Sequence, residues 1–257
     1  MATQPFSPAP SEEHASAAPF PHIVIDRAFA NDRVHRIAAE ARALEPDAQR
    51  PFYGQARKRG TTDRGRMGVE TLALIDDLNG PRFIAWLEEL TGIEGLIADP
   101  QLFGAGVHRI DRGGFLKIHT DFNWHAGLGL HRRLNLLLYL NQGWREEWGG
   151  HLELWHPDMS RCGARVAPLL NRMVIFSTTD TSYHGHPEPL ACPEGVTRNS
   201  LALYYYSRDP APGVRFRGSL LTDYRPRPGE RFGGPRRWLH KLKMARHRHA
   251  ATNEMSK

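Results

Sequence analysis

The sequence has few cysteines and no long apolar run, and each absence excludes a class of protein. Its 257 residues include two cysteines, Cys162 and Cys192, without a C-x-x-C pair, so neither a disulfide framework nor a cysteine-based zinc site is indicated. Nowhere do roughly eighteen apolar residues follow one another, as a membrane-spanning helix would need. We therefore expect a soluble or membrane-peripheral protein.

The start of the chain lacks both the basic residues and the apolar run of a secretory signal. It is rich in alanine, proline and serine, so residues 1–19 are predicted to be a disordered lead-in. The rest of the chain is long enough for one large β domain with helical support.

Residues 20–100 have the periodicity of a helical support region. Pro21–Asp26 alternates as a short strand, and Asn31 is predicted to cap a helix whose apolar residues recur at helical spacing. Two further helices are predicted at Val69–Leu78 and Pro81–Gly92. The second of these begins with proline and ends at glycine, as helices often do.

After Pro100 the pattern changes to short strands separated by glycine, proline or asparagine. This spacing predicts a mainly β fold with supporting α-helices, in which residues 101–207 form a double-stranded β-helix, or jelly-roll, core. Residues 123–131 are predicted to be a loop. The predicted strands are Phe103–Ile110, Phe115–His119, Leu134–Leu140, His151–Trp155, Arg165–Ala167, Met173–Ser177 and Leu201–Tyr206.

Two basic segments flank this core. Pro51–Gly68 is predicted to be a flexible loop near the barrel mouth or a solvated segment. Residues 208–257 form a basic extension, in which Arg215 to Lys257 include twelve lysines and arginines against three acids, and Pro235–Met244 is predicted to be an amphipathic helix. The extension suits an acidic partner or an anionic membrane surface, or is a solvated face. No nucleic-acid module is recognisable, so nucleic acid is not the expected partner.

The most informative motif is His119-Thr120-Asp121. In an extended strand residues i and i+2 point to the same side, so His119 and Asp121 can share one metal ion. A non-haem Fe(II) site requires two histidines and one carboxylate on one face of an octahedron. The third ligand must come from a distant strand, and His184 and His186 offer imidazoles on the same alternation. The alternative for a lone H-x-D pair is a surface position.

The segments around this motif resemble the Fe(II)- and 2-oxoglutarate-dependent dioxygenases, in particular the prolyl 4-hydroxylase-like branch. The resemblance runs from about Phe103 to Ser207. It implies a dioxygenase that uses Fe(II), 2-oxoglutarate and O₂, with ascorbate as a candidate reductant. The segments that carry the resemblance are GGFLKIHTDFN, RRLNLLLYLN, GGHLELW, NRMVIFSTTDTSYHGHP and TRNSLALYYYS.

The resemblance implies that His119, Asp121 and His184 bind iron. Relatives place a proline three residues after the last ligand, and Pro187 stands at that distance from His184. His184 is therefore preferred, and His186 is left with a supporting or substrate-side role, or none.

The resemblance also implies a site for 2-oxoglutarate. Arg198 is expected to bind the distal carboxylate, and a guanidinium matches a carboxylate bidentately and stays charged when it is partly buried. Tyr139 matches a tyrosine that donates its hydroxyl to the same carboxylate in some relatives. Asn135, four residues earlier on the same strand face, is a further candidate. A solvated position for Arg198 is the alternative.

The substrate is not determined by these motifs. The turn from His184 to Arg198 is longer than in prolyl hydroxylases and reshapes the barrel mouth. A prolyl or other amino-acid side chain is the first expectation for hydroxylation. The alternatives are a sugar or lipid-linked substrate at a membrane surface, and a jelly roll that binds a ligand without catalysis. Because Fe(II) needs a reducing compartment, we expect a cytoplasmic protein, free or peripheral to the membrane.

Overall fold

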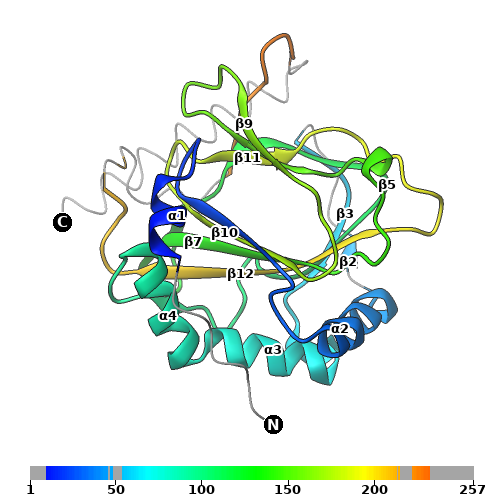
Figure 1. Ribbon diagram of the computed structural model, residues 1–257, viewed down its shortest axis with the longest axis horizontal. Coiled ribbons are helices and arrows are strands. Elements are labelled where there is room, and N and C mark those ends of the chain that lie inside the picture. The colour runs from blue at the N-terminus through cyan, green and yellow to red at the C-terminus, as the bar shows by residue number, and fades with distance from the viewer. Residues whose placement is uncertain (1–9, 46, 49–53, 213, 215–221, 232–257) are drawn as a thin grey trace.

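The computed structural model of the protein describes residues 10–45, 47–48, 54–212, 214 and 222–231. Antiparallel strands curve around a common interior, and helices lie along one side of them (Figure 1). The long strands are β1 (His22–Asp26), β3 (Gln55–Thr61), β5 (Gly106–Thr120), β7 (Leu130–Tyr139), β8 (Leu152–Trp155), β9 (Cys162–Val166), β10 (Arg172–Ser177), β11 (Tyr183–His186) and β12 (Arg198–Ser207). The predicted fold class, mainly β with a jelly-roll core, is confirmed.

The strands pair in the order β1-β10-β7-β12-β5-β11-β8-β9, and β3 pairs with the same strand, β5, that carries the H-x-D motif. Neighbours in this order are often far apart in sequence, which is how a jelly roll brings distant segments together. Four two-residue strands extend the arrangement: β2 (Asp47–Ala48), β4 (Ile97–Ala98), β6 (Trp124–His125) and β13 (Asp223–Tyr224).

Three helices cover the outer face of the strand layer that contains β7 and β12 (Figure 1). They are α2 (Asn31–Ala43), α3 (Val69–Asn79) and α4 (Pro81–Thr91). Proline at the first position of α4 and left-handed Gly92, at φ 66°, after its end agree with the predicted bounds. Asn31, however, does not cap α2: the helix begins at that residue, and its side-chain oxygen accepts a hydrogen bond from Asn171.

Strand β12 shows how the two faces of the layer are divided. Leu201, Leu203 and Tyr205 are buried against the helices. Since successive side chains of a strand point to opposite faces, Arg198 and Tyr204 point into the barrel interior. The alternation therefore places polar and charged groups inside the barrel and aliphatic groups beneath the helices.

Two segments predicted to lack regular structure have it. Within the predicted disordered lead-in, Ser11–Ser16 form helix α1, which contacts α4 and β1 and buries His14. Within the predicted loop Pro51–Gly68, Gln55–Thr61 form β3. Both corrections have one cause: composition does not reveal that a polar segment packs against a distant partner, helix α4 and strand β1 for α1, and strand β5 for β3.

Other predicted bounds change less. The strands predicted on either side of residue 112 are one continuous strand, β5, and the loop predicted at residues 123–131 contains β6 and the start of β7. The amphipathic helix predicted at Pro235–Met244 lies outside the described residues. In the part of the chain that the structure describes, no helix has the length and apolar character needed to cross a membrane.

Candidate metal and co-substrate site

The H-x-D motif lies where β5 ends, beside β11. His119 is paired in register with His184 of the antiparallel strand, and both imidazoles are buried. Opposite residues of antiparallel strands project from the same face, and the two ring centroids are 4.5 Å apart. Asp121 follows the last residue of β5 directly. One strand pair therefore brings together the three predicted metal ligands.

The donor atoms of these residues converge. Nε2 of His119 lies 3.5 Å from Oδ1 of Asp121, and Nε2 of His184 lies 3.4 Å from Oδ2 of the same carboxylate. One donor atom from each residue lies within 4.8 Å of the other two. His186 is not a member of this group, so the geometry favours His184 as the predicted third ligand.

Backbone carbonyls orient both histidines. Nδ1 of His119 lies 2.7 Å from the carbonyl oxygen of Lys117, and Nδ1 of His184 lies 2.9 Å from that of Ser182. A ring that donates its Nδ1 proton to a carbonyl leaves the Nε2 lone pair for a metal ion. Two imidazole nitrogens and one carboxylate on one side of an ion are the donors that Fe(II) binds while other positions stay open. The residues present thus fit the ion.

The protonation states suit metal binding. Burial, followed by the neighbouring His184, lowers the pKa of His119, so this imidazole is neutral near pH 7. Burial opposes ionisation of Asp121, but Arg132 and His184 outweigh it and hold the pKa of that carboxyl well below its usual range. The site therefore offers a neutral nitrogen and an ionised carboxylate without prior loss of protons.

Asn135 contacts Asp121 and Arg132, and its predicted role in the 2-oxoglutarate site stays a prediction. Its amide nitrogen donates to Oδ2 of Asp121 at 2.7 Å and so supports the carboxylate of the candidate metal site. Arg132, which the sequence did not single out, lies with NH2 3.0 Å from the same oxygen and donates from Nε to the side-chain Oδ1 of Asn135 at 2.8 Å. Arg132 lies in the polar first part of β7, before the strand predicted at Leu134–Leu140, so the alternation of apolar residues gave no signal for it.

Arg198 is the first residue of β12 and is buried in the barrel. It donates from Nε to the carbonyl oxygen of Gly150 at 2.8 Å and from NH2 to the hydroxyl of Tyr139 at 3.3 Å. Burial lowers the pKa of Arg198, and Tyr139 is the group that counteracts it; no acid among the described residues does so. A buried guanidinium without an acidic partner needs an anion. The distal carboxylate of 2-oxoglutarate fits this requirement.

Gly150 is a position where the fold needs glycine. Its φ is 74°, and an added Cβ would lie 2.6 Å from Cδ2 of Leu190 and 3.1 Å from Cδ of Arg198. We expect Gly150→Ala to lower the free energy of unfolding by about 2–4 kcal/mol, because left-handed strain and overpacking add. Urea unfolding measures this loss.

The adjacent glycine provides the control. Gly149 has a φ of 69°, but an added Cβ would meet no atom within 4 Å. Its ψ of −144° puts the backbone near a region that only glycine adopts readily, so Gly149→Ala should cost the backbone strain alone, about 1–3 kcal/mol. A loss in Gly150→Ala below about 1 kcal/mol would mean that both the left-handed backbone and the space around Arg198 tolerate a methyl group.

A family model adds independent support. The model of the 2OG-Fe(II) oxygenase superfamily matches residues 105–206, which span β5 to β12 and include the three converging donors and Arg198. This part of the chain, about two-fifths of its length, is similar to the superfamily. The oxygenase is accordingly a 2-oxoglutarate-dependent dioxygenase, with Fe(II), 2-oxoglutarate and O₂ as its cofactor and co-substrates. The alternative of a jelly roll that binds without catalysis is not supported, because no expected donor is missing.

Solved structures share the fold of the oxygenase. A prolyl-4-hydroxylase from Pseudomonas putida is 18% identical, with a TM-score of 0.53, over 77% of this chain and 97% of that chain. A prolyl hydroxylase from Trichoplax adhaerens, in complex with a hypoxia inducible factor peptide fragment, is 14% identical over 72% and 83%, with a TM-score of 0.51. HygX from Streptomyces hygroscopicus, with nickel and 2-oxoglutarate bound, is 16% identical over 79% and 92%, with a TM-score of 0.52. No curated protein matches the sequence.

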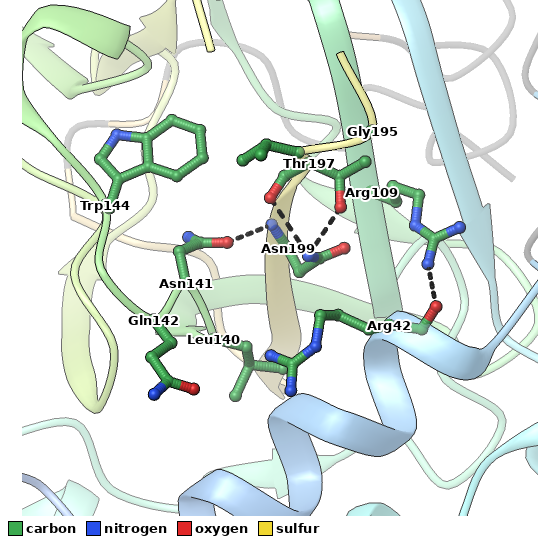
Figure 2. A pocket seen from close by; sticks show the side chains of 10 residues that line it. Arg42, Arg109, Leu140, Asn141, Gln142, Trp144, Gly195, Thr197 and Asn199 are labelled. Carbon is green, nitrogen blue, oxygen red and sulfur yellow. Dashed lines mark hydrogen bonds between the residues drawn. The ribbon is translucent and has the colours of Figure 1, made fainter. Parts of the chain in front are cut away.

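The oxygenase also has a cavity of about 460 Å³ on the face of β12 opposite to Arg198 (Figure 2). Asn199, the neighbour of Arg198, points into it together with Asn141 and Trp144. Arg109 lines the same cavity and donates to the carbonyl oxygen of Arg42, near the end of α2. The three converging metal donors are not among the lining residues, so this cavity is separate from the candidate iron site.

Proposed function

We propose that the oxygenase hydroxylates an unactivated C–H bond, using His119, Asp121 and His184 to hold Fe(II). The observation that carries the proposal is the convergence of these donors in the same barrel as a buried arginine, Arg198, that has no acidic partner among the described residues. When bound, Fe(II) allows O₂ to hydroxylate the substrate while 2-oxoglutarate is oxidised to succinate and CO₂.

The chain's own groups hold and orient the reactants. Arg198 and Tyr139 present an N–H and an O–H donor to the distal carboxylate of 2-oxoglutarate, and this fixes the keto acid end near the metal donors. Arg132 and Asn135 hold Oδ2 of Asp121, so the carboxylate cannot rotate freely. The strands that enclose these groups limit the access of water.

An amino-acid side chain, prolyl or other, is the first candidate for the hydroxylation substrate. It is supported by the likeness in fold to prolyl hydroxylases, one of them in complex with a peptide fragment. A sugar or lipid-linked substrate is the second candidate, because HygX has the same fold and has been solved with hygromycin B bound. The basic extension would then bring the oxygenase to an anionic membrane surface.

Anaerobic titration of the purified protein with Fe(II) and then 2-oxoglutarate tests the proposed cofactor chemistry. We expect the weak visible charge-transfer band of a keto acid chelated to Fe(II), followed by succinate formation when O₂ is admitted. If iron is bound but the band does not appear, 2-oxoglutarate is not the co-substrate. Removal of iron with a chelator should abolish both signals.

A further inference from the structure

Lys58 lies in the same row of side chains as Arg198. On β5, Ile110 is paired with Lys58 of β3 on one side and with Arg198 of β12 on the other. Directly paired residues in antiparallel strands point to the same face of the sheet. Because Arg198 points into the barrel interior, Lys58 does too, two strand spacings away, or roughly 10 Å between Cα atoms.

A local irregularity sets the direction of this lysine. The register between β3 and β5 shifts between Ala56 and Lys58, and the intervening Arg57 has a positive φ of 49°. Such bulges are common at barrel rims, where they re-aim a side chain. Lys58 as a whole is partly buried, and its ammonium group is on the desolvated part of the side chain.

The charges around Lys58 are not balanced. The charged groups that act on it are one acid, Asp121, and two arginines, Arg198 and Arg132. Asp121 already pairs with Arg132 at 3.0 Å, and no described acid forms an ion pair with Lys58. By contrast, the next residue, Arg59, pairs with Asp111 at 3.1 Å. Burial, the largest cause, lowers the pKa of Lys58 to about 8, so the ammonium remains mostly protonated near pH 7.

Binding of Fe(II) and 2-oxoglutarate does not remove this excess of positive charge. Fe(II) and the 2-oxoglutarate dianion bring equal and opposite charge, so the interior keeps its surplus of cations. Arg198 and Tyr139 provide the donors for the distal carboxylate. Lys58 lies on the other side of Ile110, and no acid in the described part of the chain forms an ion pair with it. A desolvated cation of this kind is stabilised by an anionic group on whatever enters the site.

We propose that Lys58 binds a carboxylate or phosphate of the substrate, so that the oxygenase selects acidic substrates over their neutral analogues. This inference rests on the proposed function, because it assumes that the substrate enters the barrel beside bound 2-oxoglutarate. It narrows both substrate candidates: an amino-acid substrate would present a carboxylate, and a sugar substrate would present a phosphate.

The test uses the full chain loaded anaerobically with Fe(II) and 2-oxoglutarate. Two matched probe pairs are titrated: N-acetylproline against its amide, and glucose 6-phosphate against glucose. Binding is followed by the shift of the charge-transfer band and by calorimetry. We expect at least one acidic probe to bind about tenfold or more tightly than its neutral partner, a difference typical of one charge-assisted contact. The pair that responds identifies carboxylate or phosphate as the group.

Variants assign the preference to Lys58. Lys58→Met should reduce the difference within the responding pair to less than about twofold, whereas Lys58→Arg should retain it. Arg59→Met removes a charge from the outer side of the same strand, and should leave the preference unchanged. The charge-transfer band should persist in all three variants.

Two results would overturn the inference. One is an equal response, or none, to the acidic and neutral members of both pairs by the wild-type protein. The other is a loss of 2-oxoglutarate affinity in Lys58→Met as large as in Arg198→Ala, which would place Lys58 in the keto acid site. Failure of the proposed function is distinguishable from both, since the band would then be absent before any probe is added.

Discussion

Replacing His184 by alanine should remove iron from the protein, whereas His186→Ala should keep the iron content at the wild-type value. Nε2 of His184 faces Asp121 at 3.4 Å, and His186 does not belong to the converging group. Loss of a supporting contact around a metal ligand costs about 10–100-fold in affinity, so loss of the ligand itself should cost at least about 100-fold. Metal analysis after anaerobic loading measures the effect.

Comparing His184→Ala with His186→Ala also controls for a general loss of stability. Both imidazoles are buried and lie on the same face of β11, so the variants create cavities of similar size in similar surroundings. A general loss of stability would therefore lower iron content in both. If His186→Ala alone loses iron, the assignment of the third ligand is wrong; if neither does, the metal is bound elsewhere.

Replacing Arg198 by alanine should weaken 2-oxoglutarate binding by about 2–5 kcal/mol, since a carboxylate would be left buried and without its partner. The guanidinium is held from two sides, by the carbonyl oxygen of Gly150 and by Tyr139, and it is in place before the co-substrate binds. Titration of the charge-transfer band with 2-oxoglutarate gives the dissociation constant directly.

The conservative variant separates charge from shape. Arg198→Lys keeps a cation but loses the planar fork that matches a carboxylate, so its affinity should lie between those of wild type and Arg198→Ala. Iron content should be unchanged in both variants, because Arg198 is not among the converging donors. An unchanged affinity for 2-oxoglutarate in Arg198→Ala would mean that another cation holds the carboxylate.

The cation-rich interior links these results to substrate choice. Arg132 stabilises the ionised form of Asp121. Arg198 is expected to bind the distal carboxylate of 2-oxoglutarate, and Lys58 has no acidic partner among the described residues. Each buried cation is costly unless an anion accompanies it. The positive charge of Arg198 is therefore balanced only when the co-substrate binds, and by our inference that of Lys58 only when an acidic substrate binds.

Some of the site was determined by sequence alone. The placement of His119 and Asp121 on one side follows from the two-residue period of a strand, which needs no knowledge of the fold. The start and end of α4 follow equally from local chemistry, proline at the first turn and glycine after the last. Features of this kind depend on residues that are close in the chain.

Tertiary structure decided the rest. His184 was separated from His186 by the register of β11 against β5. The amide of Asn135 contacts Asp121 because the segment after β5 returns to β7, with which its short strand β6 pairs. Lys58 lies in a segment predicted to be a loop, and only its pairing with Ile110 shows that its side chain is on the same face of the sheet as Arg198. Strand pairing joins residues distant in sequence through backbone hydrogen bonds that are nearly independent of side chain, so composition and periodicity carry little information about it.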